Sequence, residues 1–335
     1  MTRGALRIVA PLILTGCVAL SAENTSLVLA SRDVYLMGTR ARLSAYAETH
    51  ERGHATLESA LDTIEATEQE LSTWRQSSQI SALNRHPVGE AWRATPRLCR
   101  MFVDVWQWHR ATGGAFDPAI GRLLAAWDVH GEGVVPTDDA GVTALAASGL
   151  ALLAFDGDNC TLTRRADVAI DVGAFGKGQA LDQVAAVIGD GPWMIDLGGQ
   201  IAVGGGPPGG TGWPIGIAHP HQRDSPVLQI EITKGSLATS AGSERDLDVN
   251  GTRVGHVLDP RTGRPAPFSG SVSVWHELGM AADALSTALY VMGPEEGIPW
   301  AESRDLAACY LIPAQGALRI EMTSAFRRLL PTAAT

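Results

Sequence analysis

Residues 171–178, Asp-Val-Gly-Ala-Phe-Gly-Lys-Gly, have the composition of a loop that binds phosphate. Their three glycines let the backbone approach a ligand closely. The apolar periodicity of residues 180–188 predicts a helix directly afterwards, and a helix N-terminus attracts anions through its unpaired N–H groups and its dipole. Lys177 adds a full positive charge in a chain whose only other lysine is Lys234. We therefore predict an anion-binding turn between a β-prone stretch, residues 166–170, and this helix.

This turn differs from two common nucleotide-binding motifs. A P-loop has four residues between its first glycine and the Gly-Lys pair, and a Ser or Thr after the lysine, whereas Gly178 follows Lys177 here. The spacing of its glycines also differs from the G-x-G-x-x-G fingerprint of dinucleotide-binding domains. The alternative is a strand-to-helix turn whose glycines serve only packing.

A second group of oxygen donors lies in residues 281–288, Ala-Ala-Asp-Ala-Leu-Ser-Thr-Ala, near the start of another predicted helix. Asp283 and Thr287 are four residues apart and therefore share a helix face, and Ser286 lies beside them. One carboxylate with neutral oxygens suits Mg²⁺ better than Zn²⁺. The alternative is an aspartate that complements the helix dipole, followed by two hydroxyls bonded back to the helix.

Two further segments carry polar residues at turns. Residues 256–263, His-Val-Leu-Asp-Pro-Arg-Thr-Gly, place His256 before an ordinary turn signal, where a histidine is either structural or a proton acceptor. Residues 112–118, Thr-Gly-Gly-Ala-Phe-Asp-Pro, read as the end of a helix and a loop in which Asp117 is a candidate cap for the next helix. Neither segment identifies a reaction by itself.

The elements that must position these residues form an α+β pattern. Alternation over residues 27–46 predicts two strands broken at residues 37–39, and Leu57, Ile64 and Leu71 mark the apolar face of a helix whose acidic face we expect to be solvated. Thr95-Pro96 predicts the start of a helix that ends at residues 113–114. The second half is richer in short predicted strands, at residues 193–197, 201–203, 214–218, 227–233 and 271–275.

Composition limits the class of protein. The chain has 335 residues, 45% of them hydrophobic, which is enough for one large domain or two lobes. Its formal charge is −10 and it has no basic block, which argues against nucleic acid as a partner. We find no repeat of fixed period and no linker. The prediction is a single interleaved, two-lobed α+β domain over residues 31–335, with mixed or antiparallel sheets and flanking helices.

The N-terminus predicts export. Arg3 and Arg7 precede a short apolar run at residues 8–14, which suits the core of a signal peptide over residues 1–16. The run ends in Leu-Thr-Gly-Cys, which resembles a lipobox, so Cys17 is predicted to be lipidated and residues 17–30 to be a tether. The alternatives are a secretory signal cut near Ala22 or a short membrane anchor. Three cysteines remain after Cys17, without metal-ligand spacing, so at most one disulfide is expected.

Taken together, these segments resemble the ApbE family, the FAD:protein FMN transferases, over residues 34–293. The residues that carry the resemblance are Met37-Gly-Thr39, Leu71-Ser-Thr-Trp74 with Ser81 and Asn84, Gly113-Gly-Ala-Phe-Asp-Pro118, residues 171–182, Asp196-Leu-Gly-Gly199, Leu237-Ala-Thr-Ser240, residues 256–263 and Ala282-Asp-Ala-Leu-Ser-Thr-Ala288. The resemblance implies a reaction in which FAD is split at its pyrophosphate, FMN is joined through a phosphoester to a Ser or Thr hydroxyl of an acceptor protein, and AMP leaves.

The resemblance also implies roles for individual residues. Mg²⁺ would be held by the Ala174 carbonyl, Asp283, Thr287 and Ser286, and either His256 or Asp283 would take the acceptor proton. The implied FAD contacts are Met37, Trp74, Ala115, Phe116, Asp117, Asp171, Lys177 and Val257. The expected acceptor carries a Ser/Thr flavinylation motif and belongs to an exported or membrane redox complex. The expected location is the periplasmic face of a bacterial membrane, with contact to the membrane only through the lipid on Cys17.

Three positions depart from the family pattern. Trp74 stands where the family usually has a tyrosine, and its indole offers a larger face for stacking. Gln179 replaces a frequent tyrosine, and Ala241-Gly242 replaces a usual Gly-Asp pair, which removes a carboxylate from that loop. Two other functions remain open: a periplasmic lipoprotein that binds FAD without transferring FMN, and a metal-dependent FAD pyrophosphatase that releases FMN and AMP.

Overall fold

An eight-stranded sheet joins the two halves of the chain in the computed structural model, which describes residues 26–242, 246–249, 252–314 and 317–331. Every pairing in it is antiparallel. In this sheet, the first two strands of the chain lie beside strands from its second half. The domain is therefore interleaved, as predicted. The strand order is β1 (Val28–Leu36), β2 (Thr39–Ala47), β6 (Trp193–Leu197), β7 (Gln200–Gly204), β10 (Gly235–Ala241), β15 (Ser271–His276), β16 (Ala307–Ala314) and β17 (Ala317–Met322).

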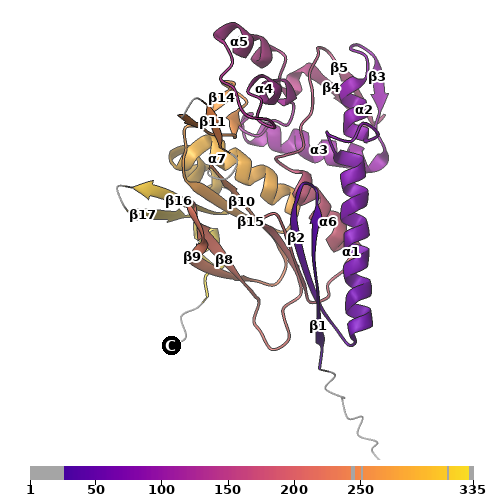
Figure 1. Ribbon diagram of the computed structural model, residues 1–335, viewed down its shortest axis with the longest axis vertical. Helices are drawn as coiled ribbons and strands as arrows, with labels where there is room; N and C mark the ends of the chain where they lie inside the picture. The colour runs from indigo at the N-terminus through magenta and orange to yellow at the C-terminus, as the bar shows by residue number, and fades with distance from the viewer. Residues whose placement is uncertain (1–25, 243–245, 250–251, 315–316, 332–335) are drawn as a thin grey trace, which may run out of the picture.

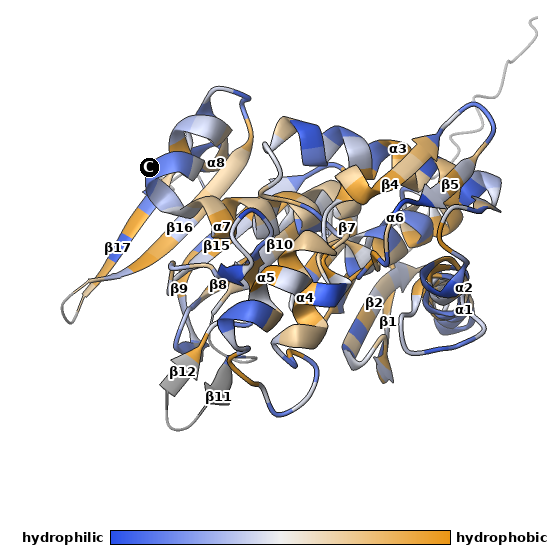
Figure 2. Ribbon diagram, turned by 90° about the horizontal axis from the view of Figure 1, so that it is seen from above, coloured by the Kyte–Doolittle hydropathy of each residue, from blue (hydrophilic) through white to orange (hydrophobic). Residues whose placement is uncertain are grey.

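Three helices pack against one another and against this sheet. The long helix α1 (His50–Leu71) runs beside β1, β2 and α6 (Gly176–Ile188), and α6 in turn packs on α7 (Gly279–Glu302) (Figure 1). Helix α7 contacts β10 and β15 and is drawn mostly in the apolar half of the scale in Figure 2. A helix that is apolar on all sides belongs in a protein core. Because α7 lies in the core, polar residues on this helix can be buried, as Asp283 is.

A smaller layer lies at the top of Figure 1, between β2 and β6 in sequence. A disulfide between Cys99 and Cys160 ties its main helix to a hairpin turn, within the predicted limit of one bridge, and Cys309 is a buried free thiol. Its elements are α2 (Gln79–Arg85), β3 (Ala91–Arg93), α3 (Pro96–Ala111), α4 (Gly121–Ala126), α5 (Asp138–Ala146), the 3₁₀ turn η1 (Leu150–Leu152), β4 (Leu153–Asp156) and β5 (Thr161–Arg164).

Short elements complete the described chain. They are the hairpins β8 (Trp213–His219) with β9 (Gln222–Ile232), β11 (Leu247–Val249) with β12 (Thr252–Val254) and β13 (Leu258–Asp259) with β14 (Arg264–Pro265), and the helix α8 (Ser324–Arg327). The strands predicted at residues 193–197, 201–203, 214–218 and 271–275 lie within β6, β7, β8 and β15, and the strand predicted at residues 227–233 extends one residue past the end of β9.

Local signals also fixed helix boundaries correctly. Thr95 caps α3 by accepting a hydrogen bond from the Leu98 amide, and two glycines with positive φ follow the helix, at residues 113 and 114. Leu57, Ile64 and Leu71 of α1 are at most 1% exposed, as their spacing predicted. These capping and periodicity signals depend on few neighbours, which is why the sequence alone reveals them.

The predicted strand before the phosphate turn is wrong. Residues 166–170 form no strand, because a side chain satisfies the backbone there. The Asn84 amide accepts from the Ile170 N–H at 2.8 Å and donates to the Ile170 carbonyl at 2.8 Å, and the Asp171 N–H donates to the Pro118 carbonyl. These hydrogen bonds satisfy backbone groups that would otherwise pair with a neighbouring strand.

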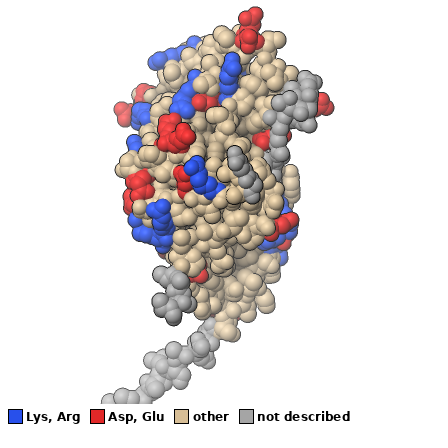
Figure 3. Space-filling view, turned by 90° about the vertical axis from the view of Figure 1, so that its left-hand side faces the viewer, with Lys and Arg blue, Asp and Glu red and all other residues tan. Residues whose placement is uncertain are grey.

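Acidic and basic side chains are interspersed on the face in Figure 3, without a large patch of one sign. Within the described residues, none of the helices has both the length and the apolar character needed to cross a membrane. The predicted signal peptide and Cys17 lie outside the described residues, and β1 begins at Val28, inside the end of the predicted tether.

Candidate functional site

The glycine-rich turn leads directly into the first turn of α6. The Phe175 and Gly176 amides donate to the Val172 carbonyl, and α6 begins at Gly176 with no side chain capping its N-terminus. Ala174 lies within this turn and packs at the margin of the core. Lys177 is the second residue of the helix, with 24% of its side chain exposed. A lysine on an uncapped helix N-terminus is a favourable place for an anion.

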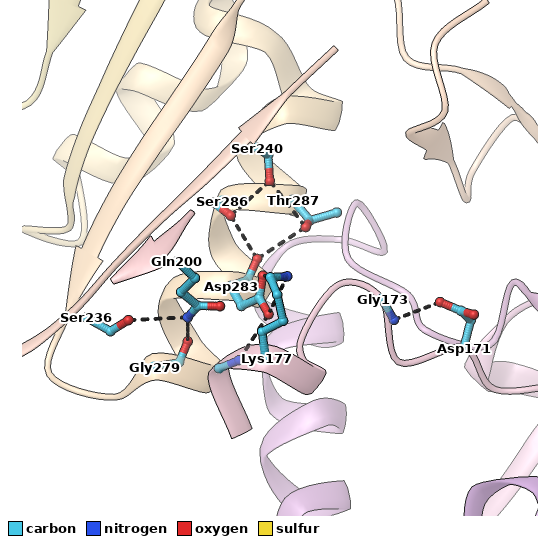
Figure 4. Close-up of polar contacts among 11 residues, drawn as sticks. Asp171, Gly173, Lys177, Gln200, Ser236, Ser240, Gly279, Asp283, Ser286 and Thr287 are labelled. Carbon is cyan, nitrogen blue, oxygen red and sulfur yellow. Dashed lines mark hydrogen bonds and ion pairs between the residues drawn. The ribbon is translucent and has the colours of Figure 1, made fainter. Parts of the chain in front are cut away.

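Asp283 of α7 meets this helix N-terminus from the other side. Its carboxylate lies 3.2 and 3.4 Å from the Lys177 ammonium and accepts a hydrogen bond of 3.1 Å from the Gly178 amide (Figure 4). Asp283 is only 5% exposed, so this pairing compensates a buried charge. The first two predicted motifs, 106 residues apart in sequence, therefore form one site.

Hydroxyl groups extend the site along α7. Ser286 and Thr287 donate to the Asp283 carbonyl at 2.9 and 3.2 Å, which is the back-bonded arrangement of the structural alternative. Ser240 of β10 lies 2.9 Å from the Ser286 oxygen and 3.5 Å from the Thr287 oxygen. Because a hydroxyl that donates its proton keeps acceptor lone pairs, this arrangement leaves oxygen ligands available beside the Asp283 carboxylate.

This donor set fits Mg²⁺. It combines one carboxylate with neutral oxygens, the chemistry that hard divalent cations prefer. Among the described residues, no three His, Cys, Asp or Glu side chains gather as a metal site, so a cation here would rely on Asp283, Thr287, Ser286, the Ala174 carbonyl and the oxygens of a bound phosphate. The Lys177 ammonium already shows that the carboxylate accepts a cationic partner.

A line of side chains connects the phosphate turn to an exposed indole. Asp171 accepts from the Gly173 amide at 2.8 Å and lies 3.4 Å from the His130 ring nitrogen Nε2. His130 in turn packs edge to face against Trp74, with ring centroids 5.3 Å apart. Trp74 is 73% exposed, so most of its aromatic surface is available to a planar ligand.

Met37 comes to the turn from the β1–β2 hairpin. It has a left-handed backbone conformation, with φ of 50°, and its amide donates to the Glu68 carboxylate at 3.3 Å. A Cβ atom on Gly176 would lie 3.9 Å from the Met37 methyl carbon. Glu68 therefore holds this hairpin, although we predicted its acidic helix face to be merely solvated.

Residues 115–117 are more deeply buried than the residues of a surface binding loop. Ala115 and Phe116 are each 1% exposed, and Phe116 packs against Phe175 in the core. The Asp117 carboxylate accepts from the Ala119 and Leu150 amides and faces His109, and burial raises its pKa. Asp117 thus binds a local turn and does not cap the next helix, which was the alternative role predicted for it, because α4 has no side-chain cap at its N-terminus. Any contact of Ala115 or Phe116 with a ligand would use backbone atoms.

His256 lies between β12 and β13, paired with a carboxylate. Its Nδ1 is 3.3 Å from the Asp246 carboxylate. A Cβ atom on Gly242 would lie 3.6 Å from that carboxylate and would overlap the Tyr290 hydroxyl, so this loop has no room for a side chain at position 242. Val257 packs at the core margin and its carbonyl accepts from the Ala266 amide.

Five residues of the site were not predicted as site residues from the sequence. Ser240 lies in a motif that indicated the family, but no role was predicted for it. Asp182 lies at the end of another such motif, also without a predicted role. A single histidine, aspartate or glutamine carries no local signal, because its role depends on a partner distant in sequence. The remaining three are His130, Asp246 and Gln200, and Gln200 donates to the Gly279 carbonyl at 2.9 Å.

Comparison with known proteins gives one consistent answer. A model of the ApbE family matches residues 37–311. A FAD:protein FMN transferase of Vibrio cholerae is 28% identical over 304 residues, which cover 88% of this chain and 90% of that protein. The FAD:protein FMN transferase of Haemophilus influenzae is 26% identical over 297 residues, with 85% of each chain covered.

Solved structures agree with these sequence matches. The crystal structure of the ApbE protein from Thermotoga maritima superposes with a TM-score of 0.83 at 26% identity, over 91% of this chain and 100% of that chain. The flavin transferase ApbE from Vibrio cholerae superposes with a TM-score of 0.81 at 26% identity, with the same coverage. The described fold therefore occurs in a solved flavin transferase.

Proposed function

The chain belongs to the ApbE family, and we propose that it is a FAD:protein FMN transferase that uses Mg²⁺ to transfer FMN to a Ser or Thr hydroxyl of an acceptor protein. The observation that carries this proposal is the meeting of Lys177, the first turn of α6 and the Asp283 carboxylate at one point. A cation, helix amides and hard oxygen ligands gathered in this way suit a pyrophosphate.

The proposed reaction exchanges the phosphoanhydride bond of FAD for a phosphoester bond to the acceptor. The acceptor oxygen forms a bond to the phosphorus of the FMN moiety, the bridging P–O bond of the pyrophosphate breaks, and AMP leaves with the electron pair. A bound Mg²⁺ would neutralise charge on the phosphate oxygens. Lys177 would hold the same phosphates by charge, and Trp74 would stack on the flavin ring.

We assign the acceptor proton to His256. Its Nδ1 faces Asp246, and a carboxylate paired with one ring nitrogen orients the imidazole and stabilises its protonated form. Asp283 is less suited to this role because its carboxylate is already engaged by Lys177 and the Gly178 amide. Asp283 would instead serve as the metal ligand, together with Thr287, Ser286 and the Ala174 carbonyl.

Export and lipidation at Cys17 remain part of the proposal. The Cys99–Cys160 disulfide supports export, because disulfides persist mainly in oxidising compartments such as the periplasm. We infer that the acceptor is an exported or membrane redox protein with a short Ser/Thr-containing flavinylation motif. Labelled-lipid incorporation by the wild-type chain, and its loss in Cys17→Ser, would support the anchor; an unlabelled wild-type chain would contradict it.

Product analysis tests the function. The full chain is incubated with FAD, Mg²⁺ and an acceptor that carries a Ser/Thr-Gly-Ala-Ser/Thr-like motif, and the nucleotides are separated by chromatography. We expect AMP together with covalently bound flavin on the acceptor. Free FMN with AMP would identify a pyrophosphatase, and intact FAD would identify a binding protein; either result would overturn the proposal.

A further inference from the structure

The first turns of α6 and α7 touch through their backbones. A Cβ atom on Gly178 would overlap the Gly279 carbonyl, and one on Gly279 would lie 2.9 Å from the Gly178 oxygen. Only glycine permits this approach. The joint lies directly beside the Gly178 amide that donates to Asp283, so its geometry bears on the proposed site.

A carboxylate from α6 caps α7 at this joint. The first amides of a helix have no partner within the helix, and Leu278, which precedes α7, supplies no side-chain cap. Asp182 of α6 takes that place: its two carboxylate oxygens accept from the Gly279 and Met280 amides at 2.5 and 2.9 Å. The cap therefore comes from a residue almost 100 positions earlier in the chain, at separations of 97 and 98 residues.

Gln200 of β7 also forms a hydrogen bond with Gly279, whose amide donates to Asp182. Its side-chain nitrogen donates to the Gly279 carbonyl at 2.9 Å, and the side chain is 2% exposed. Figure 4 shows Gln200 between Ser236 and the Asp283 side of the site. Gly279 is therefore fixed at its amide and its α-carbon by α6 and at its carbonyl by β7.

Keeping a charge in this position is costly. Burial raises the pKa of Asp182 to about 6, although the two donated amide bonds oppose that rise. A buried carboxylate used only to cap a helix could be replaced by a local Ser or Thr before the helix. The bonds from Asp182 of α6 to the first amides of α7 instead fix the position of one helix relative to the other. Asp283 lies one helical turn after Gly279, so its position depends on the same bonds.

We propose that Asp182 is a positioning residue of the metal and phosphate site, which locks the first turn of α7 onto α6 so that Asp283 stays in register with Lys177 and Gly178. This inference rests on the proposed function. Gln200 supports the same lock through the Gly279 carbonyl. Neither residue touches the reacting atoms in this account; both act through the position of Asp283.

The test compares Asp182→Asn with wild type and with Val184→Ala, a variant in the buried core of the same helix. Mn²⁺ replaces Mg²⁺ as the probe, and its binding to the FAD-loaded chain is measured by electron paramagnetic resonance. Loss of a supporting residue typically weakens metal affinity about 10- to 100-fold, and we expect that range for Asp182→Asn. FAD affinity without metal should change little, and Val184→Ala should keep wild-type Mn²⁺ affinity despite a lower melting temperature.

Wild-type Mn²⁺ affinity in a folded Asp182→Asn variant would overturn the proposal, as would an equal loss in Val184→Ala. If Asp182→Asn does not fold, Gln200→Met takes its place, with a smaller loss of Mn²⁺ affinity expected and unchanged affinity as the contradicting result. The Mn²⁺ measurement needs no acceptor. A wild-type chain that binds Mn²⁺ but transfers no FMN would therefore contradict the proposed function and leave the comparison of variants valid.

Discussion

Lys177 shows how a single residue links two parts of the site. Its ammonium lies 3.2 Å from the Asp283 carboxylate and sits in the first turn of α6, where a phosphate would bind. The charge of one side chain thus serves a buried aspartate and, in the proposed function, an anionic ligand as well. The chain offers a matched comparison, because its other lysine, Lys234, is 68% exposed and pairs with Glu277.

We predict that Lys177→Met weakens FAD binding about tenfold, because a charged contact to phosphate is worth about 1.5 kcal/mol or more. Lys234→Met should leave the dissociation constant unchanged. Fluorescence titration of FAD measures both variants. Equal affinities for wild type and Lys177→Met would show that the lysine is structural.

Trp74 gives a second prediction at this scale. Trp74→Ala should lower FAD affinity by about 1 kcal/mol through lost stacking, and Trp74→Tyr should restore most of it. Because Trp74 is 73% exposed, neither change should lower the melting temperature appreciably. Val142→Ala, at an exposed apolar position of α5, is the control. A Trp74→Ala variant with wild-type affinity would remove the indole from the flavin site.

Sequence reasoning at the residue scale succeeded where a motif joined several residues. The motifs of Lys177 and Asp283 were both predicted, although their direct pairing was not. Asp182 and Gln200 were assigned no role, because each acts on Gly279 from another element. Asp117 lies in a predicted motif, but its carboxylate is bonded to the Ala119 and Leu150 amides. A side chain's partners depend on the fold, so its role is harder to predict than its position.

At the scale of elements, the site depends on how closely α6 approaches α7. Gly178 allows the contact and Asp182 fixes it. Helix ends and strand alternation were predictable because they depend on neighbours in sequence. The false strand at residues 166–170 was not, since Asn84 satisfies the Ile170 backbone from 86 residues away.

We predict that Gly178→Ala separates these helices and lowers both the stability and the transfer rate. Inserting a methyl group against backbone typically costs about 1–3 kcal/mol of unfolding free energy. Gly191→Ala is the matched control, because a Cβ atom there would only reach ordinary contact with Trp193, at 4.0 Å. Urea denaturation and a transfer assay measure the two variants. Similar behaviour of both would show that the α6–α7 contact tolerates displacement.

At the scale of the whole molecule, one antiparallel sheet holds the two ends of the chain together and α7 carries the oxygen donors into its core. The α+β class and the interleaving were predictable from the distribution of strands and the absence of a linker. The strand order was not, because β2 pairs with β6 across a segment of more than 140 residues that contains α1, the smaller layer and α6.

The disulfide provides a prediction for the whole fold. Replacing Cys99 and Cys160 together with alanine should lower the unfolding free energy by about 2–4 kcal/mol, because the bridge closes a long loop in the unfolded chain. FMN transfer at 25 °C should persist, since neither cysteine is among the residues of the proposed site. Urea denaturation measures the loss, and added reductant should destabilise only the wild-type chain. Equal stabilities would show that the bridge does not constrain the fold.

The central claim is that this chain joins FMN to a protein through the site where α6 meets Asp283. The most direct measurement is the intact mass of an acceptor after incubation with FAD, Mg²⁺ and either wild type or Asp283→Asn. We predict that the acceptor gains the mass of one phosphoester-linked FMN with wild type, and that its rate of labelling falls by a factor of roughly 10³ with the variant. An acceptor that remains unmodified with wild type, or is labelled equally fast by the variant, would contradict the account.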